Sequence, residues 1–129
     1  MSKITECSII IKDDFNNIFL VRRKTKKNQP ILWYTVGRKL KGRETEEKCI
    51  ARAIKDDLKS LAFNVEKIGE TIIDETLGEA SSVYIGELKE KVVYGNDIAE
   101  GKWVSFQEVE NYDLADGEKE KILLCLNRY

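Results

Sequence analysis

The residues best suited to chemistry in this chain are two adjacent carboxylates, Asp56 and Asp57, which follow a glycine-containing basic segment at 37–43 (GRKLKGR). Carboxylate oxygens are the ligands that Mg²⁺ prefers, and cationic side chains bind phosphate oxygens. The chain has no histidine. This excludes Ser-His-Asp and Cys-His catalysis and disfavours a catalytic zinc site. The residue types therefore point to a divalent cation and a phosphorylated ligand.

An amphipathic helix is predicted to carry both carboxylates. Thr45 can cap its N-terminus, and two glutamates in the first turn suit the positive end of the helix dipole. At about 100° per residue, Asp56 shares a face with Ala53, and Asp57 lies between that face and an apolar stripe. The stripe should pack on a sheet, and its residues recur at steps of four, four and three: Ile50, Ile54, Leu58 and Leu61.

Apolar segments separated by turn residues predict a sheet around this helix. The predicted strands are residues 4–12, 18–23, 31–36, 65–76, 81–89 and 102–105. Turn residues predict hairpins at 13–17 and near 77–79, and the segment from Asp116 onward predicts a closing amphipathic helix. Together these elements predict one α+β domain over residues 1–129, with helices packed on a sheet.

The segment that holds the two carboxylates also resembles the signature of the Nudix hydrolases. That signature is a glycine, five residues, a glutamate, seven residues, and then Arg-Glu-apolar-x-Glu-Glu. Glu44, Arg52 and Ile54 stand at matching positions. The chain departs from the signature in three places. Arg38, directly after Gly37, replaces the glycine. Ala53 replaces the first helical glutamate, and Asp56 and Asp57 replace the glutamate pair.

This resemblance covers most of the chain and implies a fold. Residues 20–24 (LVRRK) resemble the arginine-ended strand that precedes the signature. Residues 102–112 (KWVSFQEVENY) resemble the tryptophan strand and short helix that follow it. The implied fold is a Nudix-like α/β/α sandwich, in which a mixed β-sheet lies between the central helix and the C-terminal helix.

The resemblance also implies a reaction and a cofactor. The leading hypothesis is Mg²⁺- or Mn²⁺-dependent hydrolysis of a diphosphate linkage in a nucleoside diphosphate derivative, where the cation neutralises phosphate oxygens and activates water. The implied metal ligands are Asp56, Asp57 and Gly37, because a glycine carbonyl of this segment can bind the metal in the family. Since Ala53 supplies no carboxylate, hydrolysis is expected to be slow.

Further roles follow from the same resemblance. Glu44 and Arg52 are expected to brace the basic segment onto the helix and are grouped with the catalytic residues. Glu100 joins them because some Nudix enzymes carry a late metal ligand or base in this loop, and Asp97 is its rival. The expected substrate-binding residues are Arg23, Trp33, Arg38 and Lys39.

Arg38 admits two interpretations. If its position requires a positive φ, a residue other than glycine is strained there by about 1–2 kcal/mol. Alternatively, Arg38 offers a cation to phosphate, together with Lys39, Lys41 and Arg43. Cys49, on the same side of the helix as the site, is predicted to be an inert, partly buried thiol because no obvious group activates it.

Two other functions compete with hydrolysis. A Nudix-like domain that has lost catalysis could bind a nucleotide, a metabolite or a protein partner, and Ala53 favours that interpretation. An RNA-associated module built on residues 22–27 (RRKTKK) is weaker, because no aromatic residues alternate with these cations and the formal net charge is only −1.

The composition bears on where the protein works. Apolar residues make up 42% of the chain and charged residues 35%, which is typical of soluble globular proteins. The apolar runs are too short to cross a bilayer, so no membrane partner is expected. Three widely spaced cysteines, Cys7, Cys49 and Cys125, favour reduced thiols in a cytoplasm. The oligomeric state is left open.

Overall fold

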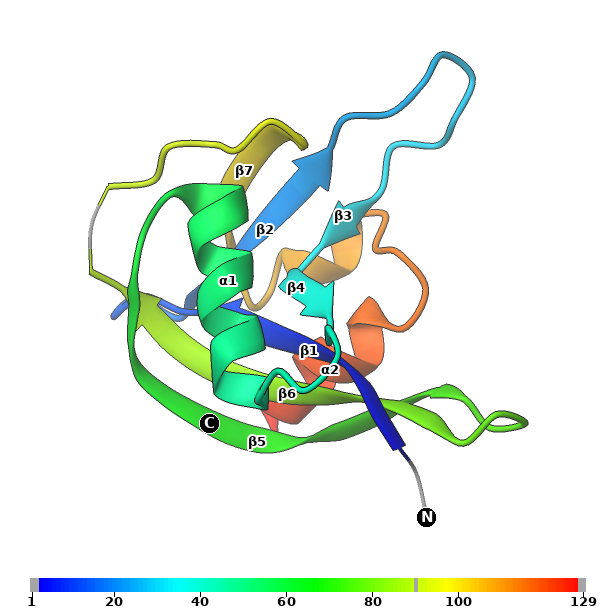
Figure 1. The fold of residues 1–129 in the computed structure, drawn as a ribbon. Helices are drawn as coiled ribbons and strands as arrows, with labels where there is room; N and C mark the ends of the chain where they lie inside the picture. The colour runs from blue at the N-terminus through cyan, green and yellow to red at the C-terminus, as the bar shows by residue number, and fades with distance from the viewer. Residues whose placement is uncertain (1–2, 90, 128–129) are drawn as a thin grey trace.

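The computed structural model describes residues 3–89 and 91–127, which form two β-sheets between two helices (Figure 1). The elements in chain order are β1 (Lys3–Ile11), β2 (Asn17–Arg23), β3 (Trp33–Tyr34), β4 (Val36–Lys39), α1 (Glu46–Leu58), β5 (Ala62–Asp74), β6 (Glu79–Leu88), β7 (Ile98–Ser105), the 3₁₀ turn η1 (Val109–Asn111) and α2 (Glu118–Leu126).

The strand pairing is mixed. One sheet has the order β4-β1-β6-β5 and the other has the order β3-β2-β7. β1 runs parallel to β6, with Ile9 opposite Tyr84, and the other pairs are antiparallel. The mixed strand directions and the two helices confirm the predicted α+β fold.

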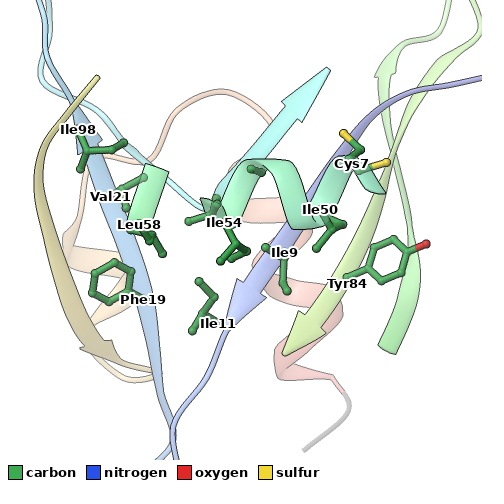
Figure 2. Packing of buried hydrophobic residues seen from close by; sticks show 13 residues of the cluster. Cys7, Ile9, Ile11, Phe19, Val21, Ile50, Ile54, Leu58, Tyr84 and Ile98 are labelled. Carbon is green, nitrogen blue, oxygen red and sulfur yellow. The ribbon is translucent and has the colours of Figure 1, made fainter. Parts of the chain in front are cut away.

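The central strands send alternate residues into two apolar cores, one beneath each helix. On β1, Cys7, Ile9 and Ile11 pack on the α1 side, where Figure 2 shows Ile9 and Ile11 near Ile54 of that helix, whereas Ile10 packs on the α2 side. β2 and β6 alternate in the same way. Because successive side chains of a strand point to opposite faces, both faces of these strands are buried, as the α/β/α sandwich requires.

Helix α1 begins as predicted and buries a wider face than predicted. The Thr45 hydroxyl accepts a hydrogen bond from the backbone N–H of Lys48, which is an N-cap. Ile50, Ile54 and Leu58 are buried, and so are the neighbouring positions Cys49, Ala53 and Asp57. The prediction for Leu61 was wrong. The helix ends at Leu58, Lys59 turns the chain with a φ of 50°, and Leu61 is 56% exposed.

The predicted strand 31–36 is also a correction, because it is two short strands in different sheets. β3 pairs with β2 and β4 pairs with β1, so the chain changes sheets at Thr35. Residues 37–39 of the expected basic loop therefore belong to a strand. Gly37 lies opposite Ser8, and a Cβ there would approach the Cys7 carbonyl oxygen to 2.8 Å, so close strand packing requires glycine.

The hairpin predicted at 13–17 was wrong: these residues form a turn, but β1 and β2 belong to different sheets and meet only at an isolated bridge between Lys12 and Ile18. The other elements follow the predictions with different limits. The β5–β6 hairpin turns at Gly78, whose φ is 67°. β7 is longer than the predicted 102–105 because it pairs with β2 from Ile98 to Ser105. The helix expected from Asp116 is α2, which begins after Gly117. Among the described residues, no helix is both long and apolar enough to cross a membrane.

Candidate functional site

A cavity of about 500 Å³ is bordered by strands of both sheets and by the start of α2. This volume lies within the range of small-molecule sites. Two sets of side chains line most of it, and the rest of the lining is Tyr34, Gly37, Asp97 and Asp116. The basic set is Arg23, Lys24, Arg38 and Lys39, from the ends of β2 and β4. The polar set is Glu6, Ser8, Thr35, Glu118 and Lys121, from β1, the β3–β4 junction and α2.

Asp57 is the buried centre of an ionic cluster beside the basic set. Its side chain is 1% exposed, and Arg23 donates from Nη2 to Oδ2 at 3.0 Å and from Nη1 to Oδ1 at 3.5 Å. Arg38 donates from Nη2 to Oδ1 as well. Arg23 also lies over the Tyr34 ring, 5.7 Å from its centroid, within the range of a cation–π contact. Two guanidinium groups thus surround one carboxylate, which leaves a charge of +1.

The backbone around Asp57 is fixed from the other side by residues 93–95. Val93 N–H donates to the Leu58 carbonyl at 2.9 Å, and Gly95 N–H donates to the Asp57 carbonyl at 2.8 Å. A Cβ on Gly95 would lie 1.9 Å from the Asp56 carbonyl oxygen. Only glycine allows this approach, which covers the last carbonyls of α1 and holds Asp57 in place.

Glu44 and Arg52 form the predicted contact between the basic segment and α1. Arg52 donates from Nε to Glu44 Oε2 at 2.8 Å and from Nη2 to Oε1 at 3.0 Å. Arg52 Nη2 also donates to the Lys39 carbonyl at 2.8 Å, and Lys41 N–H donates to Glu44 Oε1 at 3.2 Å. The Arg52 hydrogen bonds lower the pKa of Glu44 to about 2. This pair fixes the end of β4, and with it Arg38 and Lys39.

The polar set contains a buried ammonium held by two carboxylates. Lys121 Nζ lies 2.6 Å from Glu6 Oε1, 3.0 Å from Glu118 Oε2 and 2.8 Å from Ser8 Oγ. Glu118 also accepts from the Thr35 backbone N–H at 3.0 Å. Burial raises the pKa of Glu118. Burial alone would lower the pKa of Lys121, but Glu118 and Glu6 raise it. The backbone at Thr35, where the chain passes from one sheet to the other, is thus hydrogen-bonded to α2.

A divalent cation does not fit the carboxylates as they are arranged. Both Asp57 oxygens already accept hydrogen bonds from guanidinium groups. Asp56 is exposed to solvent, and Ala53 is fully buried and has no oxygen to offer. Within residues 3–89 and 91–127, no three carboxylate or thiol side chains gather where they could hold a metal ion. The geometry therefore gives no basis for a reaction step through Mg²⁺.

The structure brings only some of the predicted residues to the cavity. Arg23, Gly37, Arg38 and Lys39 line it. Trp33 packs edge-on against Tyr112, with ring centroids 5.3 Å apart, and its neighbour Tyr34 lines the cavity instead.

The two acidic candidates, Glu100 in β7 and Asp97 just before it, have different surroundings. Glu100 has a side chain that is 52% exposed, and it pairs with Arg22 at 3.4 Å. Asp97 lines the cavity. Cys49 is fully buried, and burial raises the pKa of its thiol, which suits an inert role.

The residues of the polar set were not predicted from the sequence. Glu6 and Ser8 interrupt an apolar strand at alternate positions, which places both on one face. Glu118 and Lys121 are three residues apart on a helix, which places them on one side. Either spacing could have marked a polar surface, but the meeting of β1 with the start of α2 is tertiary and has no signal in the sequence.

No family model matches this chain, and no curated protein sequence does either. Solved structures match along almost its whole length. A Nudix hydrolase from Nitrosomonas europaea has a TM-score of 0.80 at 12% identity, covering 99% of this chain and 90% of that protein. A MutT protein of Aliivibrio salmonicida or Vibrio cholerae has a TM-score of 0.81 at 15% identity, covering 98% of this chain and 100% of that protein.

A third match is the Nudix domain of NrtR from Shewanella oneidensis, in complex with ADP ribose. Its TM-score is 0.72 at 16% identity, and the match covers 99% of this chain and 88% of that protein. Identities this low establish the fold and leave the activity open. This chain therefore has the Nudix fold, which confirms the fold that the signature-like segment implied.

Proposed function

We propose that this protein binds a nucleoside diphosphate derivative in the cavity between its basic and polar sets of side chains. Arg23, Arg38 and Lys39 would contact the phosphates, because guanidinium and ammonium groups donate hydrogen bonds to phosphate oxygens. The polar set, with Glu118 and Thr35, would face the hydroxyl and amine groups of the other end of the ligand.

The observation that carries this proposal is the division of charge in the cavity. Its basic set includes two arginines already oriented by Asp57, while Glu6 and Glu118 of the polar set lie beside Lys121. Two further carboxylates, Asp97 and Asp116, line the cavity outside both sets. A ligand with an anionic end and a polar, uncharged end suits that division. The NrtR Nudix domain, which has the same fold, is in complex with ADP ribose, a ligand of this class.

Hydrolysis of a diphosphate linkage is the second candidate function. The bidentate contact between Glu44 and Arg52 favours it, because that contact is the part of the Nudix signature present here without substitution. Against it stand Ala53, which has no carboxylate, and the occupied oxygens of Asp57. Binding is therefore the function that the geometry supports best.

A panel of nucleoside diphosphates, nucleotide sugars and ADP-ribose separates the two candidates. Binding is measured by isothermal titration calorimetry in EDTA and again in Mg²⁺, and product release is measured on the same samples. We expect at least one member to bind in both buffers without being hydrolysed. Mg²⁺-dependent turnover would favour the second candidate, and a panel with no binding member would refute the proposal.

A further inference from the structure

We infer that Arg38 takes the place of a divalent cation, so that Arg38 and Arg23, held by Asp57, form a phosphate receptor that needs no metal. The inference deepens the proposed function and rests on it for the phosphate end of the ligand. It starts from the contact between the guanidinium of Arg38 and Oδ1 of Asp57.

The backbone presents Arg38 without strain. It lies in β4 opposite Cys7, and it is not one of the residues with positive φ. Its carbonyl oxygen accepts a hydrogen bond from Cys49 Sγ of α1 at 3.4 Å, which ties the strand to the helix. The first interpretation of Arg38, a strained replacement for glycine, is therefore wrong. The strand directs its side chain to Asp57.

The two arginines have donors left over for a ligand. A guanidinium group has five N–H donors. In the described part of the chain, the hydrogen bonds of Arg23 and Arg38 go to Asp57, through two nitrogens of Arg23 and one of Arg38. The side chains remain 24% and 22% exposed, and both line the cavity. Their other donors are available to an anion that enters there.

The charges explain why a cation and Arg38 exclude each other. A divalent cation at Asp57 needs at least one of its oxygens, and both are already occupied by guanidinium hydrogen bonds. A cation there would also face two positive groups at close range. Two guanidinium groups against one carboxylate leave a charge of +1, which attracts phosphate directly. Asp57 thus serves as a counter-ion that orients the receptor.

Inorganic pyrophosphate is the probe that tests this receptor. Titration calorimetry is run on wild type, Arg38→Met and Arg38→Lys, in EDTA and in Mg²⁺. We expect wild type to bind pyrophosphate in EDTA. Loss of hydrogen bonds from a charged donor should weaken binding about 10- to 100-fold in Arg38→Met. Arg38→Lys keeps the charge and should recover part of the affinity. Lys55→Met, which removes an exposed charge on α1, is the control and should bind as wild type does.

Three results would overturn the inference. They are pyrophosphate binding that requires Mg²⁺, no pyrophosphate binding in either buffer, and equal affinity in wild type and Arg38→Met. Thermal melts of each variant show whether it is folded, and Arg38→Lys keeps the test valid if Arg38→Met is not. Pyrophosphate binding in EDTA with no binding of the nucleotide panel would refute the proposed ligand and leave the receptor standing. Nucleotide binding that Arg38→Met does not weaken would refute the receptor and leave the proposed ligand standing.

Discussion

The two ionic clusters on α1 use the same chemical groups to different ends. In the first cluster, Glu44 before the helix and Arg52 in its middle form a one-to-one pair, and each also makes one hydrogen bond with the backbone. At the end of the helix, two guanidinium groups share Asp57, which leaves excess positive charge and free donors facing a cavity. The first cluster holds the backbone in place. The second has the composition of a binding site.

The two clusters also resemble the Nudix signature in different ways. Glu44 and Arg52 match it in type and spacing, and their contact supports the chain where β4 enters the loop before α1. Asp57 matches in position, but its surroundings differ because Arg38 stands where the signature has glycine. A carboxylate at the expected position therefore does not make a metal site, since its neighbours decide what it binds.

Removing the Asp57 carboxylate should have the largest effect on stability. Asp57→Ala leaves two guanidinium groups close together without their counter-ion. Breaking a buried ion pair in this way typically costs about 3 kcal/mol. Urea denaturation should show a loss of this size for Asp57→Ala. The control is Asp56→Ala, an exposed neighbour, which should change stability by less than about 0.5 kcal/mol. Equal losses in the two variants would show that the cluster does not stabilise α1.

Restoring the glutamate of the signature should destabilise this protein. Ala53 is fully buried in the core beneath α1, so Ala53→Glu must fit a larger, charged side chain there. Overpacking and burial of a carboxylate should cost about 2 kcal/mol. Ala51→Glu adds the same side chain at an exposed position of the helix and should be nearly neutral. A stable Ala53→Glu variant that hydrolyses diphosphates would show that the core is open to the site and would favour hydrolysis.

Breaking the first cluster should have a smaller effect that depends on pH. The Arg52 hydrogen bonds lower the pKa of Glu44 from 4.5 to about 2, so the ionised form stabilises the fold. This contribution is fully present above pH 4.5 and is lost as the pH falls toward 2. The stability difference between wild type and Glu44→Gln should therefore shrink over that interval. A difference that stays constant from pH 5 to pH 2.5 would contradict the pairing.

A double-mutant cycle checks the same pair independently of pH. Glu44→Gln and Arg52→Met should be strongly non-additive. The matched cycle is Arg22→Met with Glu100→Gln, a more exposed pair with a single contact of 3.4 Å. Its coupling should be smaller, as for weak surface pairs. Equal couplings would mean that the spacing match of Glu44 and Arg52 has no structural consequence.

Much of the fold could be predicted because local signals agreed with the tertiary structure. Thr45 capped the helix as its type indicated, and the apolar periodicity located the stripe of α1. The errors arose where tertiary pairing overrode the local pattern. One continuous run of strand-forming residues became β3 and β4 because β2 and β1 each paired with part of it. Leu61 followed the helical period but came after a left-handed residue that ended the helix.

The candidate site was less predictable because it depends on contacts between residues that are far apart in the sequence. The cation at Arg38 was noted as a group for phosphate, but nothing local indicated that it would reach a carboxylate 19 positions away. Trp33 was predicted to bind the substrate, but Tyr34 lines the cavity instead, since strand alternation shows that the two diverge and not which one faces the cavity. The cluster of Glu6, Glu118 and Lys121 joins the two ends of the chain.

Metal binding by the protein alone tests the central claim most directly. Mn²⁺ is titrated into ligand-free wild type and Asp57→Asn at neutral pH, and free Mn²⁺ is followed by electron paramagnetic resonance. Because Arg23 and Arg38 occupy the Asp57 oxygens, we predict no saturable site in wild type and no difference between the two proteins. One Mn²⁺ bound per wild-type chain, and lost in Asp57→Asn, would contradict the replacement of the cation by Arg38.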